Sequence, residues 1–455
     1  MPILQSRVYR RRRDPTVFSK CLLGLILFLG ALQPCFAADL VDIYQAALKN
    51  DTVYQAAAST RLSTREAVPQ SVAALLPSIN GQATVSSNYQ NITLAPPQNP
   101  LGVSNFPSRG YSISIKQPLL DIGDWLAVKQ ATNTSKQADA TLGAAAQSLI
   151  YRVATSYFQV LLAQDNLRLA KAEKAANAKQ LDQAQKRVAV GLDTKTTLYE
   201  AKAAYDKSLA SEITAQNALR NSQESIRQLT GQTYADLNSF KNNLPLVSPQ
   251  PANIEQWITA ATTYNLNLMA SRYAMEAARD NIKVKASGHL PTLNLVGSYG
   301  RDNGLNAGTT DKNSALVGLQ LDVPIFSGGA VSSNTRKAEY DFQTASANLD
   351  NTYRQVIVTT RQKYNDVLAD ISKIKAEREA IKSAQLSLDS TQESFAAGTR
   401  TIVDVLLAQK NLYDAKRNAA SDQYNYLLDS LLLKQEAGTL HPDDLQQINR
   451  WLHRL

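Results

Sequence analysis

The stretch AGTRTIVD at residues 397–404 separates two long helical patterns, and a close counterpart, VGLDTKTT, does the same at residues 190–197. Each stretch places a glycine, Gly398 or Gly191, after one helical pattern and a threonine before the next. Glycine commonly ends a helix because it adopts positive φ without strain. We therefore expect Gly191 and Gly398 to be the turn residues of two helical hairpins.

Other matches keep nearly the same spacing of 207 residues that separates Gly191 from Gly398. Tyr157 corresponds to Tyr364, and residues 117–119 resemble residues 323–325 with a shift of 206. A unit of this length is far longer than the roughly 20 to 50 residues of solenoid repeats. The sequence therefore predicts two copies of one half-molecule, arranged about a pseudo-symmetric axis.

The helices beside the two turns are too long for a compact globule. Residues 121–189 contain no proline, and 69 helical residues at about 1.5 Å each would extend roughly 100 Å. The matching stretch, residues 330–397, has an apolar seam that first repeats every 11 residues and later every 7. An 11-residue repeat favours nearly straight packing, whereas a 7-residue repeat gives a left-handed coiled coil. We expect that coiled coil to form with the returning helix at residues 403–434.

Four segments alternate apolar and polar residues as β-strands do. They lie at residues 79–89, 111–116, 292–299 and 317–323, and the connections between them include a loop with Pro96, Pro97, Asn99, Pro100 and Pro107, and a loop around residues 300–314. Strands of about ten residues with two different faces fit a transmembrane barrel. The same alternation fits a soluble antiparallel sheet equally well.

Four prolines favour a common boundary between these strands and the helices. Proline tolerates a strand end but blocks continuation of the ladder. We expect elbows at the same end of both strand pairs, with Pro77 and Pro291 preceding strands and Pro118 and Pro324 following them.

The N-terminus has the features of a secretory signal. Arg10 to Arg13 form a basic region, an apolar run of 12 residues ends at Leu32, and small residues at Cys35 and Ala37 suit cleavage after Ala37. Lipidation of Cys35 is the alternative, which the preceding Gln-Pro pair disfavours. The predicted division is a signal peptide at 1–37, a first repeat at 38–231, an irregular linker at 232–252, a second repeat at 253–438 and a tail at 439–455. Within the first repeat, residues 39–74 are expected to be helical with a kink near Pro69.

Removal of this signal changes what composition implies. Six basic and one acidic side chain lie before residue 38, so the formal net charge falls from +9 to +4. A weak positive charge gives no argument for a nucleic acid partner. Both cysteines are also lost, and the three histidines are scattered. We therefore expect no cofactor, no metal site and no enzymatic activity.

The strand count constrains assembly. Four strands cannot close a barrel, and open sheet edges are not tolerated in lipid. Two copies would supply eight strands and three would supply twelve. An eight-stranded barrel fills its interior with its own side chains, so a conducting pore favours three copies.

The duplicated halves, the strand-exit motif VPIFSGG at 323–329, and the turn segment from Gly398 followed by NLYDAK at 411–416 carry a family resemblance. In these features the chain resembles the TolC-like outer membrane efflux protein family. The resemblance covers nearly the whole chain after residue 37. It implies a mixed α and β membrane protein: a trimeric transmembrane barrel continued by a periplasmic helical barrel of coiled-coil hairpins. It also implies export of drugs or proteins together with a periplasmic adaptor protein and an inner membrane pump. The barrel would be surrounded by the lipid of the outer membrane.

The resemblance further implies a gate at the periplasmic helical tips. In the family a Tyr and an Arg on one hairpin hold the neighbouring hairpin, and two acidic positions line the entrance. Here Phe395 and Arg400 stand at the positions of the Tyr and the Arg, and Thr196 and Thr197 stand on the hairpin that they would face. Asp404 and Leu407 stand at the two positions that line the entrance. Phe395 lacks the hydroxyl, Thr197 stands in place of an Asp, and Leu407 in place of an acid, so polar restraint is expected to fall mainly on Arg400.

Other interpretations of the same residues stay open. Thr401 and Asp404 fit a helix capping box, and Arg400 fits a solvated turn. For the whole protein the alternative is a coiled-coil scaffold or adhesin stalk without a pore, and an enzyme is the least favoured class.

Overall fold

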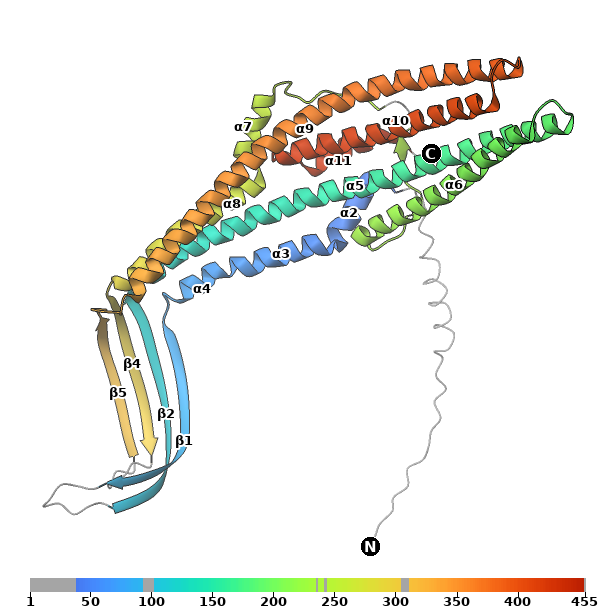
Figure 1. The fold of residues 1–455 in the computed structure, drawn as a ribbon. Helices are drawn as coiled ribbons and strands as arrows, with labels where there is room; N and C mark the ends of the chain where they lie inside the picture. Colours follow the sequence, from blue (N-terminus) through green and yellow to red (C-terminus); the bar gives the residue numbers. More distant parts are fainter. Residues whose placement is uncertain (1–37, 93–101, 235, 241–243, 304–310, 454–455) are drawn as a thin grey trace, which may run out of the picture.

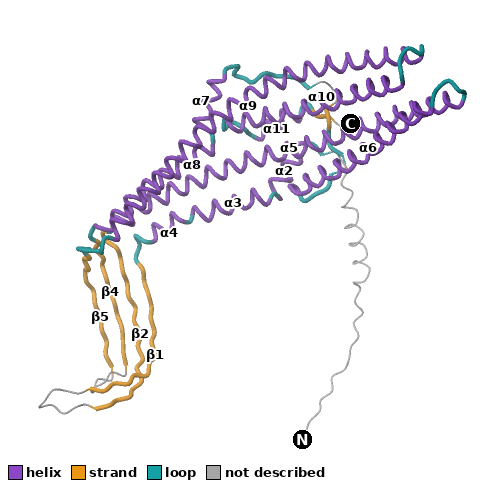
Figure 2. Tube along the Cα trace, viewed as in Figure 1, coloured by secondary structure: helices purple, strands orange, loops and turns teal. Residues whose placement is uncertain are grey.

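The computed structural model describes residues 38–92, 102–234, 236–240, 244–303 and 311–453. The expected signal peptide and Pro96, Pro97, Asn99 and Pro100 lie outside these residues. The described chain is elongated, with a β-sheet at one end and long helices that run from it to two hairpin tips at the other (Figures 1 and 2).

The sheet contains the four predicted strands, β1 (Ser78–Ile92), β2 (Gly102–Leu120), β4 (Thr292–Asn303) and β5 (Asp311–Asp322). They pair antiparallel in the order β1-β2-β4-β5. The register aligns Ile79, Ile115, Gly297 and Val317 in one row, and Gly81, Ile113, Tyr299 and Ala315 in a row on the same face. Asn80, Ser114 and Ser298 share a row on the opposite face. The predicted alternation therefore gives the sheet one mainly apolar and one mainly polar face.

The apolar face is uncovered in the single chain. The exposed fraction is 69% for Ile79 and 84% for Val317. β1 and β5 each pair on one side only within the described residues. An apolar sheet face and two open edges are unfavourable in water.

Details of the strands differ from the sequence predictions. Pro107 is not in a loop, because it lies in β2 opposite Ser87. Pro118 does not follow β2 but lies within it, since the β1 ladder has ended at Lys116 and the β4 ladder shifts register beyond Pro118. β4 extends to Asn303 and β5 begins at Asp311, so both strands run into the loop expected at 300–314, of which residues 304–310 lie outside the described residues. Pro77 and Pro291 immediately precede β1 and β4, and Pro324 follows β5.

Four long helices form the two predicted hairpins, which we call the first hairpin, α5 (Ile122–Ala189) with α6 (Lys195–Thr230), and the second hairpin, α9 (Ala330–Ala396) with α10 (Ile402–Glu436). Near the sheet, α9 packs on α8 (Leu266–Ala286), and farther along it packs on α10 (Figure 1). Buried seam residues of α9 include Val356, Tyr364 and Ile374. The change of partner agrees with the change of apolar repeat along this helix.

The helix expected at residues 39–74 is instead three helices, α2 (Leu40–Asn50), α3 (Thr52–Arg65) and α4 (Ala67–Ala73). The first break occurs at Asp51, whose carboxylate accepts from the Tyr54 backbone N–H at 2.6 Å and pairs with Arg152 of α5 at 2.8 Å. Pro69 lies in the first turn of α4, where proline is tolerated. The break predicted near Pro69 is confirmed, since α3 ends at Arg65 and α4 begins at Ala67, and the additional break at Asp51 was not predicted.

The largest core lies between the sheet and the tips. Phe158 of α5 stacks on Tyr424 of α10 and on Phe240 of β3 (Ser239–Phe240), with ring centroids 5.9 and 6.4 Å apart. β3 pairs with β6 (Leu452–His453), and α7 (Ile254–Tyr264), α11 (Pro442–Asn449) and the 3₁₀ turn η2 (Ser287–His289) complete the fold. The segment after Gly438 contains the helix α11, which buries Leu445 and Ile448 in this core.

Candidate gate at the helical tips

The two tips share one backbone design. After α5, the Gly191 N–H donates to the Val188 carbonyl and the Leu192 N–H to the Arg187 carbonyl. After α9, Gly398 and Thr399 donate in the same way to Phe395 and Ser394. This is the Schellman motif, which requires positive φ at the glycine. The φ angles of +75° and +79° at Gly191 and Gly398 agree with the expected turns.

Each tip then starts its second helix with a threonine cap. Thr194 caps α6, and Thr401 caps α10. In the second tip the Asp404 carboxylate also accepts from the Thr401 backbone N–H at 2.9 Å and from its hydroxyl at 2.8 Å. The capping box predicted for Thr401 and Asp404 is therefore confirmed. These hydrogen bonds, together with the charge of Arg400, lower the pKa of Asp404.

Arg400 lies close to Asp404 in the chain. Its Nη1 is 3.7 Å from the Asp404 carboxylate, and 60% of the Arg400 side chain is exposed. Among the described residues of this chain, no hydrogen bond joins Arg400 to Thr196. The guanidinium has five N–H donors, so the pairing with Asp404 leaves donors directed to the surroundings of the tip.

The first tip contains a polar cluster that the sequence did not single out. Asp193 accepts from the Thr197 hydroxyl at 2.7 Å and from the Thr194 backbone N–H at 3.0 Å. Its other oxygen lies 3.3 Å from Nε of Arg187. The Thr197 bond and the further donors lower the pKa of Asp193. The Asp-Thr pair at the start of a helix was a visible signal for this cluster, but the contribution of Arg187 was not.

Phe395 joins the two tips. It packs at the edge of a cluster formed by Leu388, Val405 and Leu412. The guanidinium carbon of Arg187 lies 5.2 Å from the centroid of its ring, which is a cation–π distance. Thus the residue without a hydroxyl still contacts the other hairpin, through its ring face.

Leu407 lies away from this contact. It is 56% exposed and, with Leu406 and Lys410 of α10, lines an open groove against α5 and α6. A second groove of about 890 Å³, on the side of Phe395 and Arg187, separates α5 from the second hairpin. The structure therefore places Phe395 against Arg187 of the first tip and Arg400 beside Asp404. It does not bring Leu407 together with either of these pairs.

Side-chain links between the hairpins continue above the tips. Buried Gln409 of α10 donates to Asn177 of α5 at 2.8 Å. Arg417 pairs with Glu173 at 2.8 Å, and the Tyr424 hydroxyl donates to Asp165 at 2.8 Å. Since all three links join α10 to α5, the hairpins are held together along much of their length.

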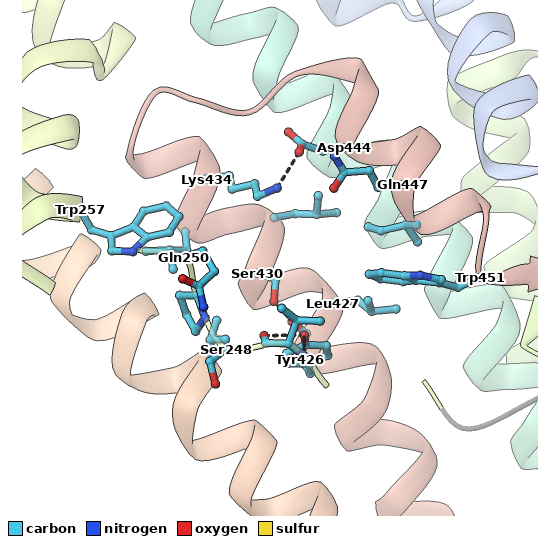
Figure 3. A pocket seen from close by; sticks show the side chains of 16 residues that line it. Ser248, Gln250, Trp257, Tyr426, Leu427, Ser430, Lys434, Asp444, Gln447 and Trp451 are labelled. Carbon is cyan, nitrogen blue, oxygen red and sulfur yellow. Dashed lines mark hydrogen bonds and ion pairs between the residues drawn. The ribbon is translucent and has the colours of Figure 1, made fainter. Parts of the chain in front are cut away.

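A separate cavity of about 310 Å³ lies in the central core (Figure 3). Trp257, Trp451 and Leu427 contribute apolar walls, and the ammonium group of Lys434 points to Asp444 at 2.6 Å. None of the residues that line this cavity belongs to either tip, so the cavity is not part of the candidate gate. Within the described residues, no group of three His, Cys, Asp or Glu side chains could hold a metal ion.

None of the described helices is both long and apolar enough to cross a membrane. The fold instead combines a four-stranded sheet that has an uncovered apolar face with two long helical hairpins. This combination defines the class of channel-forming proteins with a helical tunnel, and comparisons with known proteins agree.

The model of the outer membrane efflux protein family matches residues 43–232 and 257–439. The outer membrane protein TolC of Vibrio cholerae serotype O1 is 38% identical, and the alignment covers 93% of this chain and 96% of that protein. The proteases secretion protein PrtF of Dickeya chrysanthemi is 31% identical, with 94% of each chain covered. The CmeC outer membrane channel of Campylobacter jejuni has the same fold, with a TM-score of 0.76 at 18% identity over 90% of this chain and 89% of CmeC.

The chain belongs to the outer membrane efflux protein family. It is an outer membrane protein of the export channel class, with its helical part forming the tunnel.

Proposed function

We propose that three copies of this chain form one continuous export channel. The observation that carries the proposal is the sheet with two open edges and an apolar face, continued by helices that run to the tips. Three copies would supply twelve strands and remove every edge. The apolar face would then meet lipid, and the polar face would line the pore.

The channel would work with other envelope proteins. We infer that a periplasmic adaptor protein and an inner membrane pump engage the helical end, and that drugs or secreted proteins are the cargo. Support comes from relatives named for efflux and for protease secretion. The protein would need no cofactor, no nucleic acid and no catalytic activity of its own. Conductance of the purified protein in a lipid bilayer tests this function, because a coiled-coil scaffold or adhesin stalk would not conduct.

We also propose that the chain is a tandem duplication, with units at 38–231 and 253–438 joined by 232–252 and followed by a tail at 439–455. The repeated order of helix, strand pair, long helix and return helix supports this division. Residues 1–37 would be removed as a signal peptide. The elbows at Pro77, Pro291 and Pro324, together with the register shift of β2 beyond Pro118, would mark the membrane boundary of both units.

The mature protein purified in detergent should have the mass of a trimer, and heating in denaturing detergent should convert it to monomer. The physical reason is that the sheet edges of one chain are satisfied only by other copies. Mass measurement of the detergent complex checks this, and a stable monomer that inserts and conducts would contradict it.

For the gate, we propose that Phe395, Arg400, Thr196, Thr197, Asp404 and Leu407 surround the periplasmic entrance, with Gly191 and Gly398 turning the hairpins. The exposed guanidinium of Arg400 supports a contact with a neighbouring copy, because Asp404 uses only part of its donor capacity. The cap geometry of Asp404 does not oppose a pore role, since its side chain is still 36% exposed.

Arg400→Ser should raise the conductance of the isolated, closed channel. One lost hydrogen bond typically costs on the order of 1 kcal/mol, and three symmetric copies would multiply the effect on closure. The double change Phe395→Tyr, Thr197→Asp should lower the conductance by restoring a polar pair. Single-channel recording measures both, and unchanged closed-state conductance in both variants would mean that apolar packing at Phe395 and Leu407 holds the tip shut.

A further inference from the structure

Arg187 occupies an unusual place among the charged residues of the tips. Basic neighbours such as Lys186 form ordinary pairs within their own helix, here with Asp182 at 2.6 Å. The side chain of Arg187 instead contacts residues outside its own helix, namely Asp193 across the turn and the ring of Phe395 on the other hairpin. These two positions are 208 residues apart in sequence, so the contact exists only when the hairpins lie side by side.

The surroundings of Arg187 fix its direction. Its carbonyl accepts from the Leu192 N–H at 2.9 Å in the turn, and its Nε lies 3.3 Å from Asp193, which is only 16% exposed. Asp193 is itself held by Thr194 and Thr197. A guanidinium restrained in this way loses little further freedom when it stacks on an aromatic ring. The turn therefore presents a preoriented cation to the second hairpin.

The ring that receives it is restrained as well. Phe395 packs beside buried Leu388, Val405 and Leu412, and its carbonyl accepts from the Gly398 N–H at 3.0 Å. It thus belongs both to the α9–α10 coiled coil and to the second turn. A movement that separates the two hairpins at the tips must take the ring of Phe395 away from Arg187.

We propose that Arg187 is a positioning residue of the gate, which holds the closed tip by cation–π contact with Phe395 while Asp193 orients it. This inference rests on the proposed channel function and assigns part of the restraint to a contact within one chain. Phe395 then acts through its ring rather than through a hydroxyl, and its contact differs from any bond that Arg400 makes to a neighbouring copy.

The test is Arg187→Gln, which removes the cation but keeps a long polar side chain. A cation–π contact at a partly exposed site changes an equilibrium by a factor of about two to five, so three copies would shift the open-to-closed ratio about tenfold to a hundredfold in single-channel recordings. Phe395→Leu, which keeps apolar packing but removes the ring, should give a similar shift. The double variant should open little more than either single variant.

The matched control is Lys186→Gln, because Lys186 carries the same charge one residue earlier and lines the same groove. It should leave the open-to-closed ratio unchanged. Equal effects of the Lys186 and Arg187 changes, or additive effects of the Arg187 and Phe395 changes, would overturn the proposal. Assembly is checked by the mass of each variant, and if Arg187→Gln fails to assemble, Phe395→Leu paired with Arg187→Met, which also removes the cation, supplies the same comparison. A wild-type protein that does not conduct would instead reject the channel function itself.

Discussion

Gly438→Ala should prevent most of the protein from assembling. Gly438 follows α10 at φ +71°, and its N–H and that of Thr439 complete a Schellman motif with Gln435 and Lys434. A Cβ at this position would overlap the carbonyl group of Tyr264 and lie 2.9 Å from the Asn265 nitrogen. Backbone cannot rotate away as a side chain does, so the junction between α7 and α8 would have to move.

The junction has little freedom to move. Asn265 is buried, caps α8 and donates to the Glu436 carbonyl at 2.9 Å. Left-handed backbone costs alanine about 1 to 2 kcal/mol, and overpacking typically adds 1 to 3 kcal/mol. A total of about 4 kcal/mol is a large fraction of the stability of a typical domain. Trimer yield in detergent and the temperature of trimer dissociation measure the effect.

Gly398→Ala is the matched control for this change. Gly398 has the same hydrogen-bonding motif and a φ of +79°, but nothing lies within 4 Å of an added Cβ. Only the backbone cost applies, so this variant should assemble nearly as well as the wild type. Equal losses in both variants would show that positive φ, rather than the contact with Tyr264, decides the outcome.

The sequence predicted those parts of the fold that depend on local chemistry. Glycine after a helix and threonine before the next specified both tips, because the Schellman motif and the N-cap use residues close in sequence. Period-2 alternation specified the strands but not their ends. Proline is expected outside a strand because it has no N–H to donate to a neighbouring strand. At Pro118 no such hydrogen bond is required, because the β1 ladder has ended at Lys116 and the β4 ladder shifts register, and only the pairing of β2 with both strands shows this.

The candidate gate was harder to predict from the sequence, because part of it depends on contacts between residues far apart in the chain. The capping role of Asp404 was predicted from a spacing of three residues, and the structure has it. The contact between Arg187 and Phe395 depends on how two hairpins pack, which no local pattern determines. Likewise Asp51 ends α2 partly through its pair with Arg152, 101 residues away. Tertiary partners of single charged residues were the information that the sequence lacked.

The second large effect is expected at Asp404. If three copies surround a narrow entrance, their carboxylates form a ring of negative charge that concentrates cations about tenfold to a thousandfold. The pKa of Asp404 is lowered by its hydrogen bonds with Thr401 and by the charge of Arg400. Within one chain these contacts favour the ionised form of the carboxylate at neutral pH.

Asp404→Ala and Asp404→Asn together separate charge from capping. Both remove the ring of charge, but the asparagine amide oxygen can still accept from the Thr401 N–H. Block by a trivalent cation added on the side of the helical tips should weaken at least about tenfold in both variants. Asp414→Asn removes an equal charge farther along α10, where Asp414 pairs with Lys410 and Arg417, and should leave block unchanged. If Asp404→Asn is blocked like the wild type while Asp404→Ala destabilises the trimer, Asp404 is a helix cap and not a pore residue.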